Sequence, residues 1–158
     1  MPPSLRPYRP KDFEAIHAID QSCYPAAIAY SKWELARYLR LPGADCLVAQ
    51  LGGKPIGFVL TARERTEGHI ITIDVVSSHR RLHIGSALLT AAEKRLAENG
   101  CTVIELETAT NNSAAISFWQ RHGYQTRRVL KHYYPGGLDA FSMTKSLKAR
   151  RATEKEPI

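Results

Sequence analysis

The spacing of hydrophobic residues divides the chain into helical and extended segments. Four segments repeat apolar side chains at helical spacing and have a cap or a breaker at an end, such as Ser31 before one and Gly100 after another. These patterns predict helices over residues 10–23, 32–41, 84–99 and 112–121. Runs rich in alternating or β-branched residues predict strands over residues 46–51, 56–63, 69–76, 102–109, 124–130 and 139–147.

The order of these segments favours an α/β fold in which helices are layered on one sheet. Gly52-Gly53, between the first two predicted strands, is typical of a hairpin turn. A length of 158 residues suits one domain with a single core. We expect that domain to cover residues 1–147 and residues 148–158 to form a basic, disordered tail.

Composition and charge narrow the class of protein. Hydrophobic residues make up 44% and charged residues 23% of the chain, which excludes a fibrous or fully disordered protein. The net charge is +7, and the last fourteen residues contribute five basic against two acidic side chains. This balance suits an anionic partner, whether nucleic acid, a membrane surface or a phosphorylated small molecule, and does not choose among them.

Three widely spaced cysteines, Cys23, Cys46 and Cys101, predict neither a disulfide framework nor a thiolate zinc site. The histidines show no metal-ligand spacing, so no metal is expected. The N-terminal residues lack the apolar core of a signal peptide, and no segment approaches the roughly 18 apolar residues of a membrane span. We therefore expect a cytoplasmic protein without a membrane partner.

The segment with the clearest chemistry joins a predicted strand to a predicted helix. Residues 80–88, RRLHIGSAL, form a basic loop that opens directly onto the helix. Backbone N–H groups at a helix start lack intrahelical partners and lie at the positive end of the helix dipole, an arrangement that favours phosphate. Neither the Rossmann nor the Walker pattern is present. From this loop alone, a plain basic turn is an equally good interpretation.

Two segments together point to a family. Residues 80–88 resemble the Gln/Arg-x-x-Gly-x-Gly/Ala acetyl-CoA loop of the GCN5-related N-acetyltransferase (GNAT) superfamily. Residues 106–124, LETATNNSAAISFWQRHGY, are similar to that superfamily's second signature, in which a strand leads into an Asn-x-x-Ala helix that ends at a Gly-aromatic pair. The resemblance covers about residues 5–147. It implies the GNAT fold, with a single mixed, mostly antiparallel central sheet and helices on both faces.

Within the superfamily, residues 133–135 (YYP) and 139–143 (DAFSM) resemble N-terminal protein acetyltransferases, above all the bacterial ribosomal-protein-alanine enzymes. The resemblance implies direct acetyl transfer, in a ternary complex, from acetyl-CoA to the N-terminal α-amine of a protein such as a ribosomal protein. Two alternatives remain open. One is an acetyltransferase for a small-molecule amine, and the other is a non-catalytic CoA-binding or RNA-associated module. Direct binding of nucleic acid is left undecided.

The resemblance also assigns residues to acetyl-CoA. The expected cofactor-binding residues are Ile73, Asp74, Val75, Arg80, Arg81, Leu82, His83, Ile84, Gly85, Ser86, Asn112 and Trp119. Two of them depart from the family pattern, because His83 replaces the first glycine of the loop and Trp119 replaces the tyrosine that serves as the acid. An indole N–H donates a hydrogen bond but is no proton shuttle. The leaving thiolate would then be protonated by another group such as Tyr133 or Tyr134, or by water, or would leave unprotonated.

Glu107 is the expected general base. Strand alternation places Glu105 and Glu107 on one face, so periodicity alone does not choose between them, and the resemblance selects Glu107. A carboxylate base suits an α-amine, whose ordinary pKa of about 8 lies roughly 2.5 units below that of lysine. The resemblance makes the backbone N–H of Val75 the expected donor to the thioester oxygen. The expected substrate-binding residues are Tyr24, Tyr30, Tyr133 and Tyr134, for which ordinary packing is the alternative.

Overall fold

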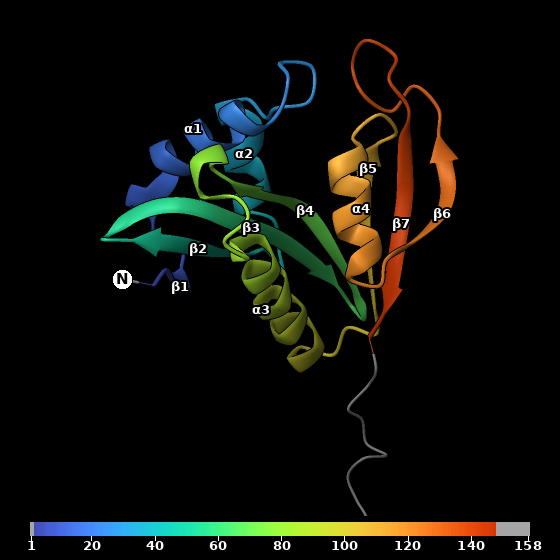
Figure 1. Ribbon diagram of the computed structural model, residues 1–158. Helices are drawn as coiled ribbons and strands as arrows, with labels where there is room; N and C mark the ends of the chain where they lie inside the picture. The colour runs from blue at the N-terminus through green and yellow to red at the C-terminus, as the bar shows by residue number, and fades with distance from the viewer. Residues whose placement is uncertain (1, 148–158) are drawn as a thin grey trace, which may run out of the picture. The chain divides into compact units, whose positions relative to one another are not determined.

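The computed structural model describes residues 2–147 of the chain (Figure 1). Its sheet has the strand order β1-β2-β3-β4-β5-β7-β6, in which β4 and β5 are parallel and β5–β7, β7–β6, β1–β2 and β2–β3 are antiparallel. The strands are β1 (Ser4–Pro7), β2 (Asp45–Leu51), β3 (Lys54–Glu64), β4 (Glu67–Val75), β5 (Val103–Ala109), β6 (Gln125–Leu130) and β7 (Ala140–Ser146). The helices are α1 (Phe13–Cys23), α2 (Lys32–Leu39), α3 (Ile84–Glu98) and α4 (Ser113–Arg121). The predicted fold class is confirmed.

The described chain divides into two compact units. The first comprises residues 2–62 and 70–92, and the second comprises residues 63–69 and 93–147. Strand β4 contributes its first three residues to the second unit and the rest to the first. The expected extent of the domain, residues 1–147, stays a prediction, and the expected tail at 148–158 lies outside the described residues.

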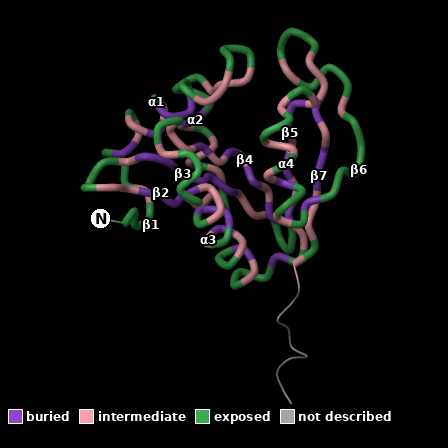
Figure 2. The backbone as a smooth tube through the Cα atoms, in the orientation of Figure 1, coloured by how far each residue is buried: buried purple, intermediate pink, exposed green. Residues whose placement is uncertain are grey.

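In the first unit, helices pack on both faces of the strands. The face covered by α1 and α2 has a core of Ile16, Ile19, Leu35, Cys46, Val48, Phe58 and Leu60. The opposite face is covered by α3, and its core consists of Leu47, Ala49, Ile56, Val59, Ile84, Leu88 and Ala92. Figure 2 shows these strands buried and the outward sides of the helices exposed. This packing holds residues 70–75 of β4 and the start of α3 in place.

In the second unit, β5 lies between the first residues of β4 and all of β7. Ile104 and Leu106 are buried, whereas Glu105 and Glu107 alternate with them on the other face, as the sequence predicts. Strand β6 is exposed along nearly its whole length (Figure 2). The Tyr124 hydroxyl donates to Glu93 (2.7 Å), and the Lys145 ammonium donates to the same carboxylate (3.0 Å).

Most element boundaries agree with the sequence predictions to within two residues. The Ser31 side chain accepts from the Glu34 N–H and the Glu34 carboxylate accepts from the Ser31 N–H, so the predicted cap is confirmed. Gly52 and Gly53 form the predicted turn between β2 and β3. Gly100, with φ of 91°, ends the third helix as predicted.

Two features at the N-terminus were not predicted from the sequence. Strand β1 is only four residues long and ends at Pro7, so it has no clear strand pattern. The carboxylate of Asp12, the residue directly before α1, makes no cap hydrogen bond to α1 and instead binds the Arg6 guanidinium through two contacts of 2.8 Å. None of the helices within residues 2–147 combines the length and the apolar character that crossing a membrane requires.

Candidate functional site

The basic loop of the first unit, residues 80–86, combines a left-handed backbone with the start of a helix. Arg81 (φ 71°) and His83 (φ 61°) both adopt the left-handed conformation, and turns that contain such residues can direct successive backbone N–H groups toward one anion. Helix α3 begins at Ile84, and its first turn holds no acidic side chain. The first turn of this 15-residue helix and the two arginines therefore fit a pyrophosphate chemically. We call residues 80–86 the anion loop.

Arg80 ties the anion loop to the end of β4. Its Nε donates to the Val75 carbonyl (2.9 Å), and its Nη2 lies 3.3 Å from the Cys23 sulfur. Arg81 and His83 are exposed, and Leu82 keeps 56% of its surface accessible. Arg80 and Arg81 are thus both exposed cations of the loop, and Arg80 has a structural role as well.

His83→Gly is expected to keep or tighten CoA binding at this loop and to raise the free energy of unfolding by up to about 1 kcal/mol. Glycine adopts the left-handed conformation without the steric cost that a β-carbon imposes. Isothermal calorimetry with CoA and thermal unfolding measure the two effects. Arg81→Gly is the matched control, since it relieves the same backbone strain but removes a cation, and we expect it to weaken binding. A large loss of CoA affinity in His83→Gly would show that the imidazole contacts the ligand.

The second half of β4 offers its backbone to the loop that follows α1. We call residues 24–31 the acceptor loop, after the expected role of Tyr24 and Tyr30 in binding the substrate that accepts the acetyl group. The Tyr30 hydroxyl donates to the carbonyl of Ile71 and the Tyr24 hydroxyl to that of Ile73, each over 3.4 Å. The Cys23 thiol extends this series, because it donates to the Val75 carbonyl at 3.5 Å. Alternate carbonyls of β4 therefore accept hydrogen bonds from two side chains of this loop and from the last residue of α1.

Of the three β4 residues expected to contact acetyl-CoA, Asp74 is the one whose side chain points into the protein. Its carboxyl group is 2% exposed and accepts a hydrogen bond from the Thr72 hydroxyl (2.8 Å). Ile73 and Val75 are half-buried against the α3 side of the first unit. Any contact that Asp74 makes with a ligand outside the core must therefore use its backbone.

In the second unit, Glu107 pairs with a histidine that the sequence analysis did not select. His69 Nε2 lies 2.8 Å from Glu107 Oε1, and the Glu107 side chain is 16% exposed. Burial lowers the pKa of His69, but the hydrogen bond and the charge of Glu107, with a smaller effect of Glu105, raise it more, so that the net pKa lies above its ordinary value. The other candidate, Glu105, accepts a hydrogen bond from the Ser142 hydroxyl (3.0 Å). Of these two carboxylates, Glu107 is the one paired with a second titratable group.

Tyr134 lies in the electrostatic field of this pair. Burial, together with the negative charge of Glu107, raises the pKa of Tyr134 to about 12. Its ring packs edge-on against Tyr133 with the centroids 4.9 Å apart, and Tyr133 is 47% exposed. Tyr134 is therefore near enough to Glu107 for the charge of that carboxylate to raise its pKa, and Tyr133 lies on the solvent side.

Two residues expected to contact acetyl-CoA, Asn112 at the N-cap of α4 and Trp119 within this helix, contact other parts of the protein. The Asn112 side chain caps α4 by accepting from the Ala115 N–H (3.1 Å). Trp119 is buried and packs edge-on against Phe118 and Tyr124, with centroid distances of 5.1 and 5.4 Å. Their contacts with a ligand stay predictions.

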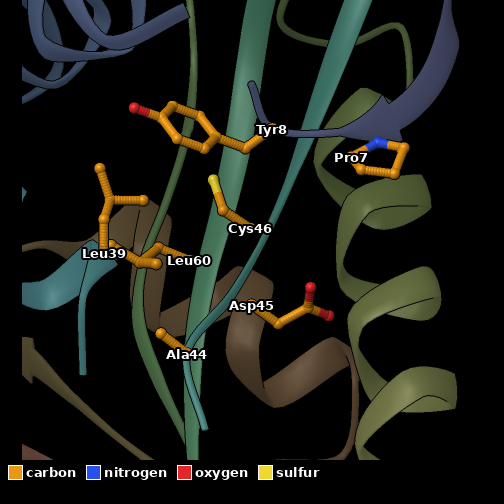
Figure 3. Close-up of a pocket in the computed structure, with 7 residues that line it drawn as sticks. All are labelled: Pro7, Tyr8, Leu39, Ala44, Asp45, Cys46 and Leu60. Carbon is orange, nitrogen blue, oxygen red and sulfur yellow. The ribbon is translucent and has the colours of Figure 1, made fainter. Parts of the chain in front are cut away.

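One pocket of the first unit lies apart from all of these residues. It has a volume of about 170 Å³ and is lined by Pro7, Tyr8, Leu39, Ala44, Asp45, Cys46 and Leu60. Figure 3 shows Tyr8, Leu39, Cys46 and Leu60 around it, with the Asp45 carboxylate pointing away. This volume is below the roughly 300 Å³ at which pockets for small organic ligands begin. Within residues 2–147, no three His, Cys, Asp or Glu side chains gather as metal ligands.

His69 could not be selected from the sequence, because it lies 38 residues before Glu107. Only the parallel pairing of β4 with β5, in the register His69↔Glu105, brings the two side chains together. Asp20, which is fully buried in α1, was also missed. Its one signal is an acidic residue among the apolar positions of a predicted helix.

Comparison with known proteins identifies related sequences and folds. Residues 13–124 match the sequence model described as the acetyltransferase (GNAT) family. The N-alpha-acetyltransferase of Sulfurisphaera tokodaii is 30% identical over 156 residues, covering 90% of this chain and 92% of the relative.

Two solved structures show the same fold. Ard1 from Thermoplasma volcanium is similar with a TM-score of 0.86 and 26% identity, over 94% of this chain and 99% of that one. The ribosomal-protein-S18-alanine N-acetyltransferase from Escherichia coli has a TM-score of 0.84 and 23% identity, over 99% and 100% of the two chains.

Proposed function

This chain belongs to the acetyltransferase (GNAT) family and is an N-acetyltransferase, and we propose that its acceptor is the N-terminal α-amine of a protein. The resemblance inferred from residues 80–88 and 106–124 is thereby confirmed. Acetyltransferases with this fold use acetyl-CoA. The observation that carries the proposal is the Glu107–His69 pair, with Tyr134 beside it, in a member of this family.

We assign the binding of acetyl-CoA to the first unit. The left-handed backbone at Arg81 and His83, the start of α3 and the exposed Arg81 support a pyrophosphate site on the anion loop. Acetyl-CoA supplies an activated acyl group whose thioester carbon accepts the amine. The Val75 N–H is the proposed donor to the negative charge that develops on the thioester oxygen.

Glu107 is proposed to take the proton that the amine must lose. The α-ammonium group first loses one proton and becomes the nucleophilic amine. The nitrogen–carbon bond then forms as the carbon–sulfur bond breaks, so a second proton leaves the nitrogen and one is available to the sulfur. His69, hydrogen-bonded to Glu107, is placed to receive the proton onward or to hold the carboxylate in position. Tyr134 stays protonated at neutral pH because its pKa is about 12, which suits it for donating a hydrogen bond.

The acidity of the substrate's ammonium group supports this acceptor class. A carboxylate abstracts a proton more readily from an α-ammonium group than from lysine, by roughly 3 kcal/mol. The name of the Sulfurisphaera relative, an N-alpha-acetyltransferase, supports the same acceptor class. A ribosomal protein is one possible acceptor, supported by the fold shared with the Escherichia coli enzyme.

A thiol-release assay tests this proposal. Peptides that differ in their first residue should release free CoA thiol from acetyl-CoA, whereas the same peptides with a blocked α-amine and a free lysine should release little. Mass spectrometry then places the acetyl group on the N-terminus. Acetylation of polyamines or aminoglycosides, with no turnover of peptides, would replace the α-amine by a small-molecule acceptor. Binding of CoA without turnover of any amine would identify a non-catalytic module.

His69→Asn is expected to move the acidic limb of the kcat profile to lower pH. The Glu107–His69 pair gains basicity as His69 loses its proton, and that loss is centred above its ordinary pKa of about 6.5. In the wild type, kcat therefore rises as pH rises through the His69 pKa, and the variant, which has no imidazole at position 69, loses this contribution to the limb. Saturating peptide and acetyl-CoA isolate kcat from binding. A limb that remains in place in the variant would assign it to another group.

A further inference from the structure

Two carboxyl groups of the first unit are buried against each other. Asp20 on α1 is 0% exposed and Asp74 on β4 is 2% exposed, and Asp20 lies close enough to raise the pKa of Asp74. Carboxylates carry no donor, so a hydrogen bond between the two would require a proton on one of them.

The hydrogen bonds of the two carboxyl groups leave one oxygen of each without a donor. Asp20 Oδ2 accepts from the Tyr30 N–H (2.8 Å), and Asp74 Oδ1 accepts from the Thr72 hydroxyl (2.8 Å). Among residues 2–147, Asp20 Oδ1 and Asp74 Oδ2 are the two buried side-chain oxygens that find no N–H or O–H donor. One proton held between the carboxyls would satisfy both oxygens, because the protonated oxygen donates the hydrogen bond and the other accepts it.

Among the main effects on the Asp74 carboxyl from residues 2–147, none comes from a basic side chain. Burial first, and then Asp20, raise the pKa of Asp74 well above its ordinary value, against smaller opposing effects of Thr72 and Tyr24. The Cys23 thiol faces the same carboxyl, and the nearby cation, Arg80, is bound to the Cys23 sulfur and the Val75 carbonyl. A buried pair in this setting keeps one proton rather than two charges.

This pair lies where the acceptor loop joins β4. Asp20 holds the backbone of Tyr30, while Asp74 stands between Ile73 and Val75, the residues proposed to contact acetyl-CoA. The hydroxyls of Tyr24 and Tyr30 add two longer hydrogen bonds to β4. Only the link through Asp20 and Asp74 joins two fully buried polar side chains among these contacts.

We propose that Asp20 and Asp74 share one proton and act as positioning residues that fix the acceptor loop to the strand proposed to contact acetyl-CoA. The effect on acceptor binding rests on the proposed function, whereas the shared proton does not. Loss of that proton at alkaline pH leaves two buried negative charges and frees the loop. The link is therefore complete at neutral pH and weakens as pH rises.

Matched variants at position 20 test the catalytic consequence. Asp20→Ala removes the acceptor for the Tyr30 N–H and is expected to raise the peptide KM about tenfold or more, with a smaller change in the acetyl-CoA KM. Asp20→Asn keeps an oxygen for Tyr30 and offers an amide N–H to Asp74, so we expect it to recover most of that loss at neutral pH. Equal effects of the two variants, or equal changes in both KM values, would refute the positioning role.

The shared proton is tested without any acceptor. Because the pKa of Asp74 is raised, wild-type stability declines as pH rises from the ordinary aspartate range through the raised value. Asp20→Asn removes one of the two charges but leaves Asp74 buried, so its melting temperature should decline less over the same pH range than that of the wild type.

NMR of the wild type with carbon-13 in its aspartate carboxyls should show one group of the pair protonated at pH 7. Two ionised carboxylates at that pH would overturn the proposal even if the variants fail to fold. A protein that acetylates no peptide but retains the proton would overturn only the proposed function.

Discussion

Replacing Glu107 with glutamine is expected to lower kcat by about 100- to 10,000-fold, with little change in the melting temperature or in CoA binding. The amide retains an oxygen that accepts from His69 but takes no proton from the amine. Removing a general base typically costs a factor of this size. Thiol release at saturating peptide and acetyl-CoA measures kcat, and calorimetry with CoA measures binding.

Glu105→Gln is the matched control for this experiment. Glu105 lies two residues earlier on the same face of β5, but its carboxylate accepts from Ser142 rather than pairing with a histidine. We expect this variant to retain kcat within about threefold. Full activity in Glu107→Gln would remove Glu107 from the proton transfer, and a matching loss in Glu105→Gln would show that strand charge, rather than one base, governs the rate.

Local sequence signals predicted the elements well because each signal acts over a few residues. Ser31 and Glu34 form a cap within one turn, and Gly52-Gly53 and Gly100 act at single positions. The order of strands β5-β7-β6 and the parallel pairing of β4 with β5 depend on contacts between distant segments, for which no local pattern exists. The residue pairs that this order creates were therefore beyond prediction from the sequence.

The same distinction between local signals and distant contacts applies to the residues of the candidate site. Glu107 was selected through a motif, yet its partner His69 follows only from the strand register. His83 was identified as a replacement for glycine, and its φ of 61° supplies the physical reason that glycine suits the position. Asp74 was assigned to the cofactor by its place in the motif, whereas its buried side chain faces Asp20. Motifs thus located positions, and packing determined what each side chain does there.

Asp12→Ala is expected to lower the free energy of unfolding by about 3 kcal/mol, because it leaves the Arg6 guanidinium without its bidentate partner in a mostly buried setting. Asp12 is 4% exposed and also accepts from the Arg9 N–H (2.8 Å), so it joins β1 to the start of α1. Urea unfolding monitored by circular dichroism gives the difference.

The pH dependence of this contact has a definite sign. Arg6 chiefly, opposed by burial, lowers the pKa of Asp12 from 3.8 to about 2. A lowered pKa means that the contribution, about 2 kcal/mol, is complete above pH 3.8 and is lost as pH falls through about 2. The difference between wild type and Asp12→Ala should therefore shrink over that interval and stay constant above it.

Glu14→Ala is the matched control for Asp12, since Glu14 lies two residues later and pairs with Lys32 at a highly exposed position. Exposed ion pairs contribute little, so we expect this variant to unfold like the wild type at every pH. Because α1 carries Asp20, a weakened start of this helix should also raise the peptide KM of Asp12→Ala before global unfolding begins. An Asp12→Ala protein as stable as the wild type at pH 7 would show that the Arg6 contact contributes no net stability.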